Sequence, residues 1–216
     1  MKALHNIGIH PGNALLVIVD VQNEFCQPGG KWYSEISPRI VPGVISAIRE
    51  LAAQARSASI PVIYIQSVRT HQEPQFTLWQ RPLCLKIGSW AAQIVDEIQP
   101  QPSDIVVQKF SHDPFFKPDL DQVLHRLVAD PLRCYAVVTG GAVNVCVYHT
   151  VLGLHLRNYW TVVPVDCVYY LNDAGKERAL EQFSEPAYPN VFLTRSDLIA
   201  VSRTPTASSS WPAPGT

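Results

Sequence analysis

Six short apolar runs, rich in β-branched residues, constrain the fold of this chain more than any other feature. They occupy residues 14–19, 60–66, 104–108, 135–138, 159–164 and 190–193. Segments with the apolar spacing of helices lie between them, at residues 42–57, 91–98, 120–128, 144–157 and 174–183. Continuous apolar strands that alternate with helices are typical of a parallel sheet with right-handed crossovers. We therefore expect an α/β fold of three layers (α/β/α), with a Rossmann-like six-stranded parallel sheet and helices on both faces.

The length and composition agree with one domain of this kind. The chain has 216 residues, 47% hydrophobic and 16% charged, which is enough for one full core. Residues 1–13 form a polar lead-in, and the Ser- and Pro-rich end predicts a flexible tail at 204–216. No repeat or second domain is visible, so we expect a single domain at residues 1–203.

Charge and cysteine content argue against several classes of partner. The net charge is −1 and no long basic run occurs, so we expect neither nucleic acid nor a membrane surface as a partner. The apolar runs are too short to span a bilayer, and the first residues lack a signal-peptide pattern. The chain has five scattered cysteines, at positions 26, 84, 134, 146 and 167, and no CxxC pair. This pattern predicts a reducing, cytoplasmic location.

Three residues whose side chains can take part in catalysis stand at or after the ends of predicted strands. Asp20 ends the first apolar run, Lys109 ends the third, and Cys146 follows the fourth after a turn of small residues. The carboxyl ends of parallel strands share one edge of a sheet, where ligands bind. We therefore expect these three side chains to converge on one crevice.

The surroundings of Cys146 favour a reactive thiol. The turn that begins at Gly140 and Gly141 precedes a predicted helix, with Asn144 as its N-cap and Cys146 in its first turn. The positive end of a helix dipole favours the thiolate form of cysteine. The alternative is that Cys146 is one more buried packing cysteine, and this stretch by itself does not decide between the two.

The chemistry of the three residues together is coherent. Cys146 would be the nucleophile, and Asp20 would accept its proton and later pass it to a leaving amine. Lys109 would hold Asp20 ionised or stabilise the thiolate. Backbone N–H groups of the turn at 141–146 would bind the oxyanion of a tetrahedral intermediate.

Four segments in this order resemble the isochorismatase-like cysteine hydrolases, which include nicotinamidases, N-carbamoylsarcosine amidohydrolases, biuret-type hydrolases and isochorismatases. The segments are the strand end VDVQ, the strand end VVQK, the turn TGGAVNVCV, and the strand-to-helix loop that leads to LNDA, at residues 19–22, 106–109, 139–147 and 166–174. Each segment alone is a weak signal. Their order and whole-domain spacing, over about residues 14–198, make the resemblance specific.

The resemblance implies roles for individual residues. Asp20, Lys109 and Cys146 correspond to the catalytic triad of the family. A cis peptide bond is implied between Gly141 and Ala142, with the N–H groups of Ala142 and Cys146 forming the oxyanion hole. The predicted substrate contacts come from the matched motifs and from aromatic residues of the loops, at Gln22, Phe25, Trp79, Phe115 and Gly141.

The chain also departs from the family pattern. Val143 stands where a threonine is usual, and His112 and Asp113 are unusual polar neighbours after Lys109. The first loop lacks the Asp-x-His of metal-dependent nicotinamidases, and His71 stands alone after the second strand. A lone loop histidine is far more often solvated than a ligand. We therefore expect no catalytic metal and no cofactor, and nicotinamide becomes a less favoured substrate.

Three functions remain open at this stage. The favoured one is a cysteine amidohydrolase that cleaves a C–N bond of a small amide, ureide or carbamoyl substrate through an acyl-enzyme on Cys146. The second is an isochorismatase-type hydrolase of a vinyl ether with Asp20 as acid. The third is a degenerate relative that acts as a binding module. The resemblance also implies a homo-oligomer, a dimer or a tetramer, and a small-molecule substrate as the partner.

Overall fold

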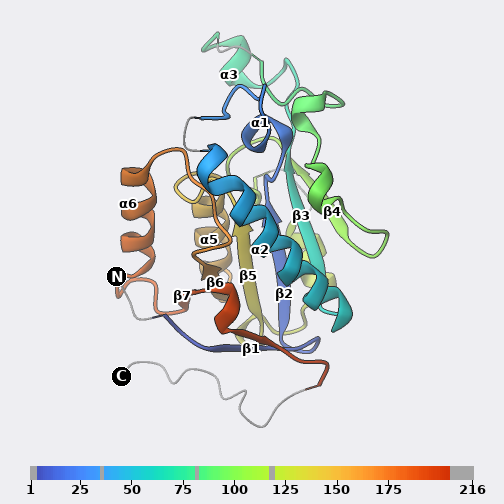
Figure 1. The fold of residues 1–216 in the computed structure, drawn as a ribbon, viewed down its shortest axis with the longest axis vertical. Coiled ribbons are helices and arrows are strands. Elements are labelled where there is room, and N and C mark those ends of the chain that lie inside the picture. The colour runs from blue at the N-terminus through green and yellow to red at the C-terminus, as the bar shows by residue number, and fades with distance from the viewer. Residues whose placement is uncertain (1–3, 35–36, 81–82, 117–119, 205–216) are drawn as a thin grey trace.

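Six parallel strands form the central sheet of the computed structural model (Figure 1), which describes residues 4–34, 37–80, 83–116 and 120–204. The strands are β2 (Ala14–Val19), β3 (Val62–Ser67), β4 (Ile105–Lys109), β5 (Tyr135–Gly140), β6 (Trp160–Pro164) and β7 (Val191–Thr194). Every neighbouring pair runs parallel, in the order β4-β3-β2-β5-β6-β7. The predicted Rossmann-like sheet is confirmed, with strand bounds that differ by at most two residues.

The order of the strands reverses at one place in this sheet. From β2 the chain moves outward to β3 and β4, and it then returns to place β5 on the other side of β2. Loops leave the carboxyl ends of β2 and β5 in opposite directions at such a switch point, which opens a crevice between them. Asp20 follows β2 and Gly141 follows β5, so the two predicted catalytic loops begin at this crevice.

Helices cover both faces of the sheet and produce two separate apolar layers. The long helix α2 (Ser37–Ser57) crosses one face, in front of the sheet in Figure 1, and buries Ile48, Leu51 and Ala55. The other face is covered by α4 (Leu120–Leu127), α5 (Cys146–His155) and α6 (Asp173–Phe183). Alternate residues of β2 pack into opposite layers, because side chains of a strand alternate between its faces. This arrangement confirms the three-layer α/β/α architecture.

A second, two-stranded sheet was not predicted from the sequence. Strand β1 (Ile7–Ile9) pairs in parallel with β8 (Ile199–Val201), so the expected polar lead-in is ordered in part. Ile7, Ile9 and Ile199 are buried against the layer that contains α2. Strands of three residues, one of which has a glycine at its centre, are too short for an alternation to be recognised in the sequence. The predicted tail begins at the end of this sheet, and from residue 205 on it lies outside the described residues.

Two predicted elements have different bounds or forms. Helix α2 begins at Ser37, and Pro38 rather than Pro42 lies in its first turn. The predicted helix at 91–98 consists of two 3-10 turns, Trp90–Ala92 and Asp96–Ile98. The segment between these turns is extended because it bonds to the loop after β2, through Val95 N–H to Val21 O and Asn23 N–H to Gln93 O.

The two irregular segments after β2 and β3 carry short helices above the sheet. The first contains α1 (Asn23–Cys26), and the second contains α3 (Pro74–Thr77). Both helices lie beyond the carboxyl ends of the strands in Figure 1. The segments therefore lie at the edge where a substrate can approach the predicted catalytic residues.

Candidate active site

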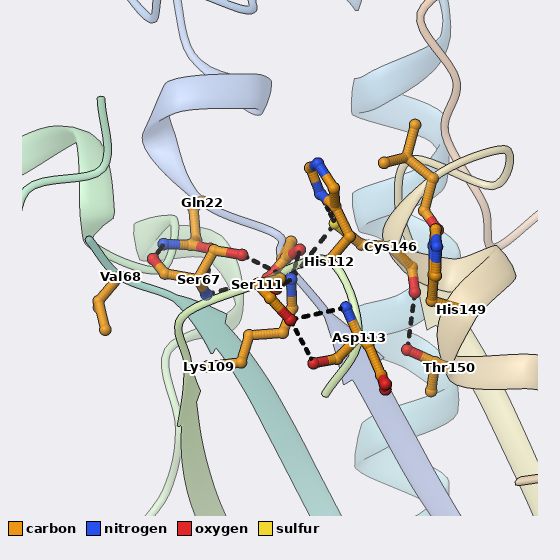
Figure 2. A network of polar contacts seen from close by, with 12 residues as sticks. Gln22, Ser67, Val68, Lys109, Ser111, His112, Asp113, Cys146, His149 and Thr150 are labelled. Carbon is orange, nitrogen blue, oxygen red and sulfur yellow. Dashed lines mark hydrogen bonds and ion pairs between the residues drawn. The ribbon is translucent and has the colours of Figure 1, made fainter. Parts of the chain in front are cut away.

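Asp20, Lys109 and Cys146 meet at the carboxyl edge of the sheet, as the sequence predicted. Asp20 follows β2, Lys109 is the last residue of β4, and Cys146 is the first residue of α5. Lys109 Nζ lies 2.8 Å from Asp20 Oδ2 and 3.3 Å from Cys146 Sγ. Figure 2 shows Lys109 and Cys146 facing each other, with Ser67 and Ser111 beside the lysine. The lysine thus bridges the carboxylate and the sulfur.

The Asp20–Lys109 ion pair is completely buried and almost fully hydrogen-bonded. Both side chains have 0% exposure. Lys109 Nζ also donates to Ser67 Oγ at 2.7 Å and to Ser111 O at 3.1 Å, and Ser67 N–H donates to Asp20 Oδ1 at 3.0 Å. Besides this ion pair, the group that faces the Asp20 carboxylate is the Cys146 thiol, and a hydrogen bond to Asp20 is among the causes that raise the pKa of that thiol. The carboxylate is therefore placed to take the thiol proton.

The charge state of Lys109 follows from this pairing. Burial lowers the pKa of the ammonium group, but attraction to Asp20 and Cys146 outweighs burial, and the pKa is raised overall. A buried charge is stable only when it is paired and hydrogen-bonded. The pairing with Asp20 therefore favours the charged form of Lys109.

Cys146 is a thiol in this site, which corrects one expectation from the sequence. Burial, and after it the negative charge of Asp20, raises the pKa of the Cys146 thiol to about 12, although Lys109 acts in the opposite direction. The predicted thiolate-favouring effect of the helix terminus is therefore outweighed. The predicted N-cap is also wrong, because Val145 holds that position without a side-chain hydrogen bond and Asn144 lies one residue earlier. Nucleophilic attack requires the proton to leave during the reaction.

The glycine turn before Cys146 has the backbone form that the family resemblance implied. The peptide bond between Gly141 and Ala142 is cis. Gly140 has a φ of +94°, and a Cβ there would overlap the carbonyl oxygen of Val19. The N–H groups of Ala142 and Cys146 have no acceptor within the part of the chain that is described. Both residues line one cavity, so these two backbone donors are available to a molecule that enters it.

A cavity of about 490 Å³ opens over the sulfur. Its apolar wall comes mostly from the two irregular segments, at Phe25, Trp32, Phe76, Leu85, Val145 and Leu171. Its polar wall contains one nucleophile, two cations and one imidazole, at Cys146, Lys31, Arg69 and His112, together with Ser67 and Cys84. The volume suits a small organic molecule.

The predicted substrate contacts divide into residues that line the cavity and residues that do not. Phe25 lines it, as do the two residues predicted for the oxyanion hole, Ala142 and Cys146. Gln22 is buried beneath it, where its amide accepts from Ser67 N–H and donates to the carbonyls of Ser67 and Ala92. Gly141 lies against the ring of Tyr169.

The two other aromatic residues that we predicted as contacts lie elsewhere. Phe115 packs on Gly153, under the guanidinium group of Arg157, whose carbon is 3.8 Å from the ring centroid. Trp79 is 68% exposed and does not line the cavity. The position of such a loop side chain depends on packing against distant segments, and the neighbouring sequence does not predict that packing.

Three residues near the sulfur differ from what the sequence indicates: Ser67 and His112 have no role assigned from it, and Arg69, a candidate for binding a substrate carboxylate, is expected in a solvated loop. Ser67 ends β3 and contacts both members of the ion pair. Arg69 is 4% exposed and donates to the carbonyls of Val68 and Lys109 at 2.8 and 3.2 Å. His112 Nδ1 lies 3.6 Å from Cys146 Sγ, as Figure 2 shows. The unusual residues after Lys109 were the only sequence signal for one of them, His112.

Two other features are absent from the described residues. No group of three or more His, Cys, Asp and Glu side chains in those residues has the arrangement of a metal site. None of the helices there combines the length and apolar character needed to cross a membrane.

Comparisons with known proteins identify relatives of this chain in sequence and in fold. The Isochorismatase domain model matches residues 14–195. Ureidoacrylate amidohydrolase RutB of Pseudomonas syringae pv. syringae (strain B728a) is 36% identical over 192 residues, covering 78% of this chain and 74% of the relative. RutB of Pantoea ananatis (strain LMG 20103) is 33% identical over 195 residues, covering 80% of this chain and 74% of the relative.

Solved structures share the fold at lower sequence identity. N-carbamoylsarcosine amidase of Thermoplasma acidophilum superposes with a TM-score of 0.70 at 24% identity, covering 86% of this chain and 97% of that protein. An isochorismatase-like hydrolase of Alkaliphilus metalliredigens superposes with a TM-score of 0.74 at 21% identity, covering 86% and 96%. The chain therefore belongs to the isochorismatase family, within the superfamily of isochorismatase-like cysteine hydrolases, and is a hydrolase.

Proposed function

We propose that this protein is a cysteine amidohydrolase that cleaves the C–N bond of a small amide, ureide or carbamoyl compound through a thioester on Cys146. One observation carries the proposal. A thiol at the floor of the cavity lies 3.3 Å from a buried lysine, which in turn lies 2.8 Å from a buried carboxylate. This arrangement joins a nucleophile, a proton acceptor and a fixed positive charge, which are the parts that acyl transfer requires.

The first half of the reaction forms the thioester. As Cys146 Sγ bonds to the substrate carbonyl carbon, its proton passes to the Asp20 carboxylate, which faces the thiol. Lys109 stabilises the negative charge that develops on the sulfur, because its ammonium group is already in place. Proton loss and attack occur together because the raised thiol pKa disfavours a free thiolate.

The tetrahedral intermediate then loses its nitrogen. The carbonyl electron pair moves onto oxygen, and the unpaired N–H groups of Ala142 and Cys146 supply donors for this oxyanion. The C–N bond breaks as Asp20 returns its proton to the nitrogen, which leaves as ammonia or an amine. Water then hydrolyses the thioester, so the second product is a carboxylic or carbamic acid.

The substrate class rests on relatives and on the size of the cavity. The named relatives act on a ureidoacrylate and on N-carbamoylsarcosine, both small molecules with a carbamoyl nitrogen. The cavity of about 490 Å³ accepts molecules of that size between apolar walls and two cations. We therefore place small ureides and carbamoyl compounds ahead of larger amides.

The test measures ammonia release from acetamide, nicotinamide, biuret and N-carbamoylglycine by the wild-type protein and by Cys146→Ala. We expect wild-type activity on at least one carbamoyl compound, and a loss on the order of 10⁴-fold in the variant. Cys134→Ala is the matched control, because Cys134 is buried in the same apolar layer but does not line the cavity. It should keep most of the activity.

Other outcomes would contradict the proposal. Full activity of Cys146→Ala would indicate chemistry that depends on Asp20 without the sulfur, as in hydrolysis of a vinyl ether. Absence of turnover on every C–N compound, together with an unmodified Cys146 after incubation with them, would indicate a binding module.

A further inference from the structure

The two sides of Cys146 differ in what can reach them. Asp20 and Lys109 have no exposed surface, and in the proposed reaction Asp20 exchanges its proton with the sulfur and with the leaving nitrogen. His112 lines the cavity, and its Nδ1 approaches the same sulfur to 3.6 Å. A water molecule that enters after the leaving amine has departed must come from the cavity. The imidazole is thus on the side from which this water attacks.

His112 is held in place by its own loop. Ser111 Oγ donates to Asp113 O at 2.9 Å and accepts from Asp113 N–H at 3.1 Å. The carboxylate of Asp113 accepts from Phe115 N–H at 2.8 Å. Ser111 O in turn accepts from Lys109 Nζ. The loop that carries the imidazole is therefore fixed to the catalytic lysine, as the network in Figure 2 shows.

The charges around His112 favour its neutral form. Burial, followed by the positive charges of Lys109, Arg69 and His149, lowers the pKa of the imidazole, while Asp20 opposes them. A neutral imidazole keeps one nitrogen that can accept a proton. Ammonium and guanidinium groups have no acceptor, so Lys31 and Arg69 cannot serve this purpose in the cavity wall.

We propose that His112 is a further catalytic residue, the base that activates water for hydrolysis of the Cys146 thioester and then returns the proton to the sulfur. This inference rests on the proposed function, because it requires an acyl-enzyme. It assigns the thiol proton to Asp20 in the first half of the reaction and the water proton to His112 in the second half.

The step balances without another reactant. Water gives one proton to His112 as its oxygen bonds to the thioester carbonyl carbon, whose electron pair moves onto oxygen. When this pair returns, the C–S bond breaks and the acid is released. The sulfur keeps the bonding electrons and takes the proton from the imidazolium ion 3.6 Å away. The thiol and the neutral imidazole are restored.

The experiment separates formation of the acyl-enzyme from its hydrolysis. The probe is p-nitrophenyl acetate, whose nitrophenolate is released when the thioester forms. We expect His112→Asn to keep the initial burst of nitrophenolate, while its steady-state rate falls about 10²- to 10⁴-fold. Mass spectrometry should find an acetyl group accumulated on Cys146. His125→Asn, which replaces a surface histidine of α4, should behave as the wild type.

Two further measurements exclude a merely structural effect. Imidazole added to His112→Ala should restore the steady-state rate without changing the burst. In the wild type, hydrolysis of the acetyl-enzyme should slow as the pH falls through the lowered pKa of His112, below its ordinary value of 6.5, and His112→Asn should lack this dependence.

Each result has a defined meaning. If the burst and the steady-state rate of His112→Asn fall together, or if neither changes, the role in thioester hydrolysis is wrong. If Cys146→Ala abolishes the burst in that same experiment, the proposed function still stands. If Cys146→Ala shows the burst of the wild type, the acyl-enzyme itself is wrong.

Discussion

The two sides of Cys146 differ in burial, in charge and in the elements that form them. Beneath the sulfur, Asp20 and Lys109 form an ion pair in which both side chains have 0% exposure, and Ser67, which also lines the cavity, hydrogen-bonds to both. Above it lies a cavity whose wall is largely apolar and comes from irregular segments. The lower side is built from strand ends, and the upper side from loops.

This difference separates the fixed charges of the site from recognition of the substrate. A buried ion pair needs fixed geometry, because each charge depends on the other for compensation. Strand ends of a six-stranded sheet provide that rigidity. A substrate wall needs variety in shape and tolerates replacement, which loops allow. Three sets of measurements test whether the two sides are independent in this way.

The largest effect is expected from breaking the ion pair. Lys109→Met leaves the Asp20 carboxylate buried without its counter-charge and should destabilise the protein by about 3–5 kcal/mol. The double variant Asp20→Asn with Lys109→Met removes both charges and should recover part of this loss. Urea unfolding of the single and double variants measures both quantities.

An exposed ion pair gives the matched control for this measurement. Arg133 and Asp130 are 79% and 50% exposed, so Arg133→Met should change stability by no more than about 1 kcal/mol. Equal effects of Lys109→Met and Arg133→Met would show that the buried pair contributes no more than a surface pair does. The contrast between the two sides of the site would then lose its energetic basis.

A smaller effect is expected from raising the pH. Burial raises the pKa of the Cys146 and Cys134 thiols from the ordinary value of 9.0 to about 12. As the pH rises, the thiols therefore lose their protons in the unfolded chain before they do so in the folded chain. The stability that the two thiols contribute is present below pH 9.0 and is lost as the pH rises toward 12. The slope is at most about 1.4 kcal/mol per pH unit for each thiol.

Urea unfolding at increasing pH measures this loss of stability. Comparison of the wild type with Cys134→Ala isolates the part that comes from one thiol. The variant should show a shallower decline than the wild type above pH 9.0, because one titrating thiol is gone. An unchanged slope would show that the Cys134 thiol titrates alike in the folded and unfolded chains. Cys134 has no charged neighbour among the causes of its shift, so it isolates the effect of burial.

The smallest effects are expected on the cavity side. Phe25 lines the cavity, so Phe25→Ala should raise KM for the best substrate of the ammonia-release panel about tenfold, with a small change in stability. Trp79 is 68% exposed and lies outside the wall, so Trp79→Ala should change stability by less than about 0.5 kcal/mol and leave KM unaltered. A large rise in KM for Trp79→Ala would show that its loop closes over the substrate.

The parts of this molecule that could be predicted from the sequence are those with a strong local pattern of apolar residues. The six strands of the sheet are continuous apolar runs, and Asp20 and Lys109 stand directly at their ends. Their convergence follows from parallel topology alone. Strand β1 was not predicted, because three residues are too few to show an alternation of apolar and polar side chains.

The rest of the site depends on contacts between distant segments. The charge state of Cys146 was mispredicted because a helix terminus is a local feature, whereas burial is a property of the whole fold. Gln22 was assigned to the substrate, but its amide instead joins the carbonyls of Ser67 and Ala92. The partners of Arg69 and His112 lie 40 and 34 residues away and could not be inferred from neighbouring residues.

The buried thiol of Cys146 also has a consequence for oxidative damage. Peroxides attack thiolates, and a protonated thiol reacts with them slowly. Because its pKa is raised to about 12, Cys146 spends almost all of its resting time in the protonated form. The nucleophile becomes reactive only when a substrate carbonyl is present to receive the sulfur. The same burial that delays attack thus protects the resting protein from conversion of Cys146 to a sulfenic acid.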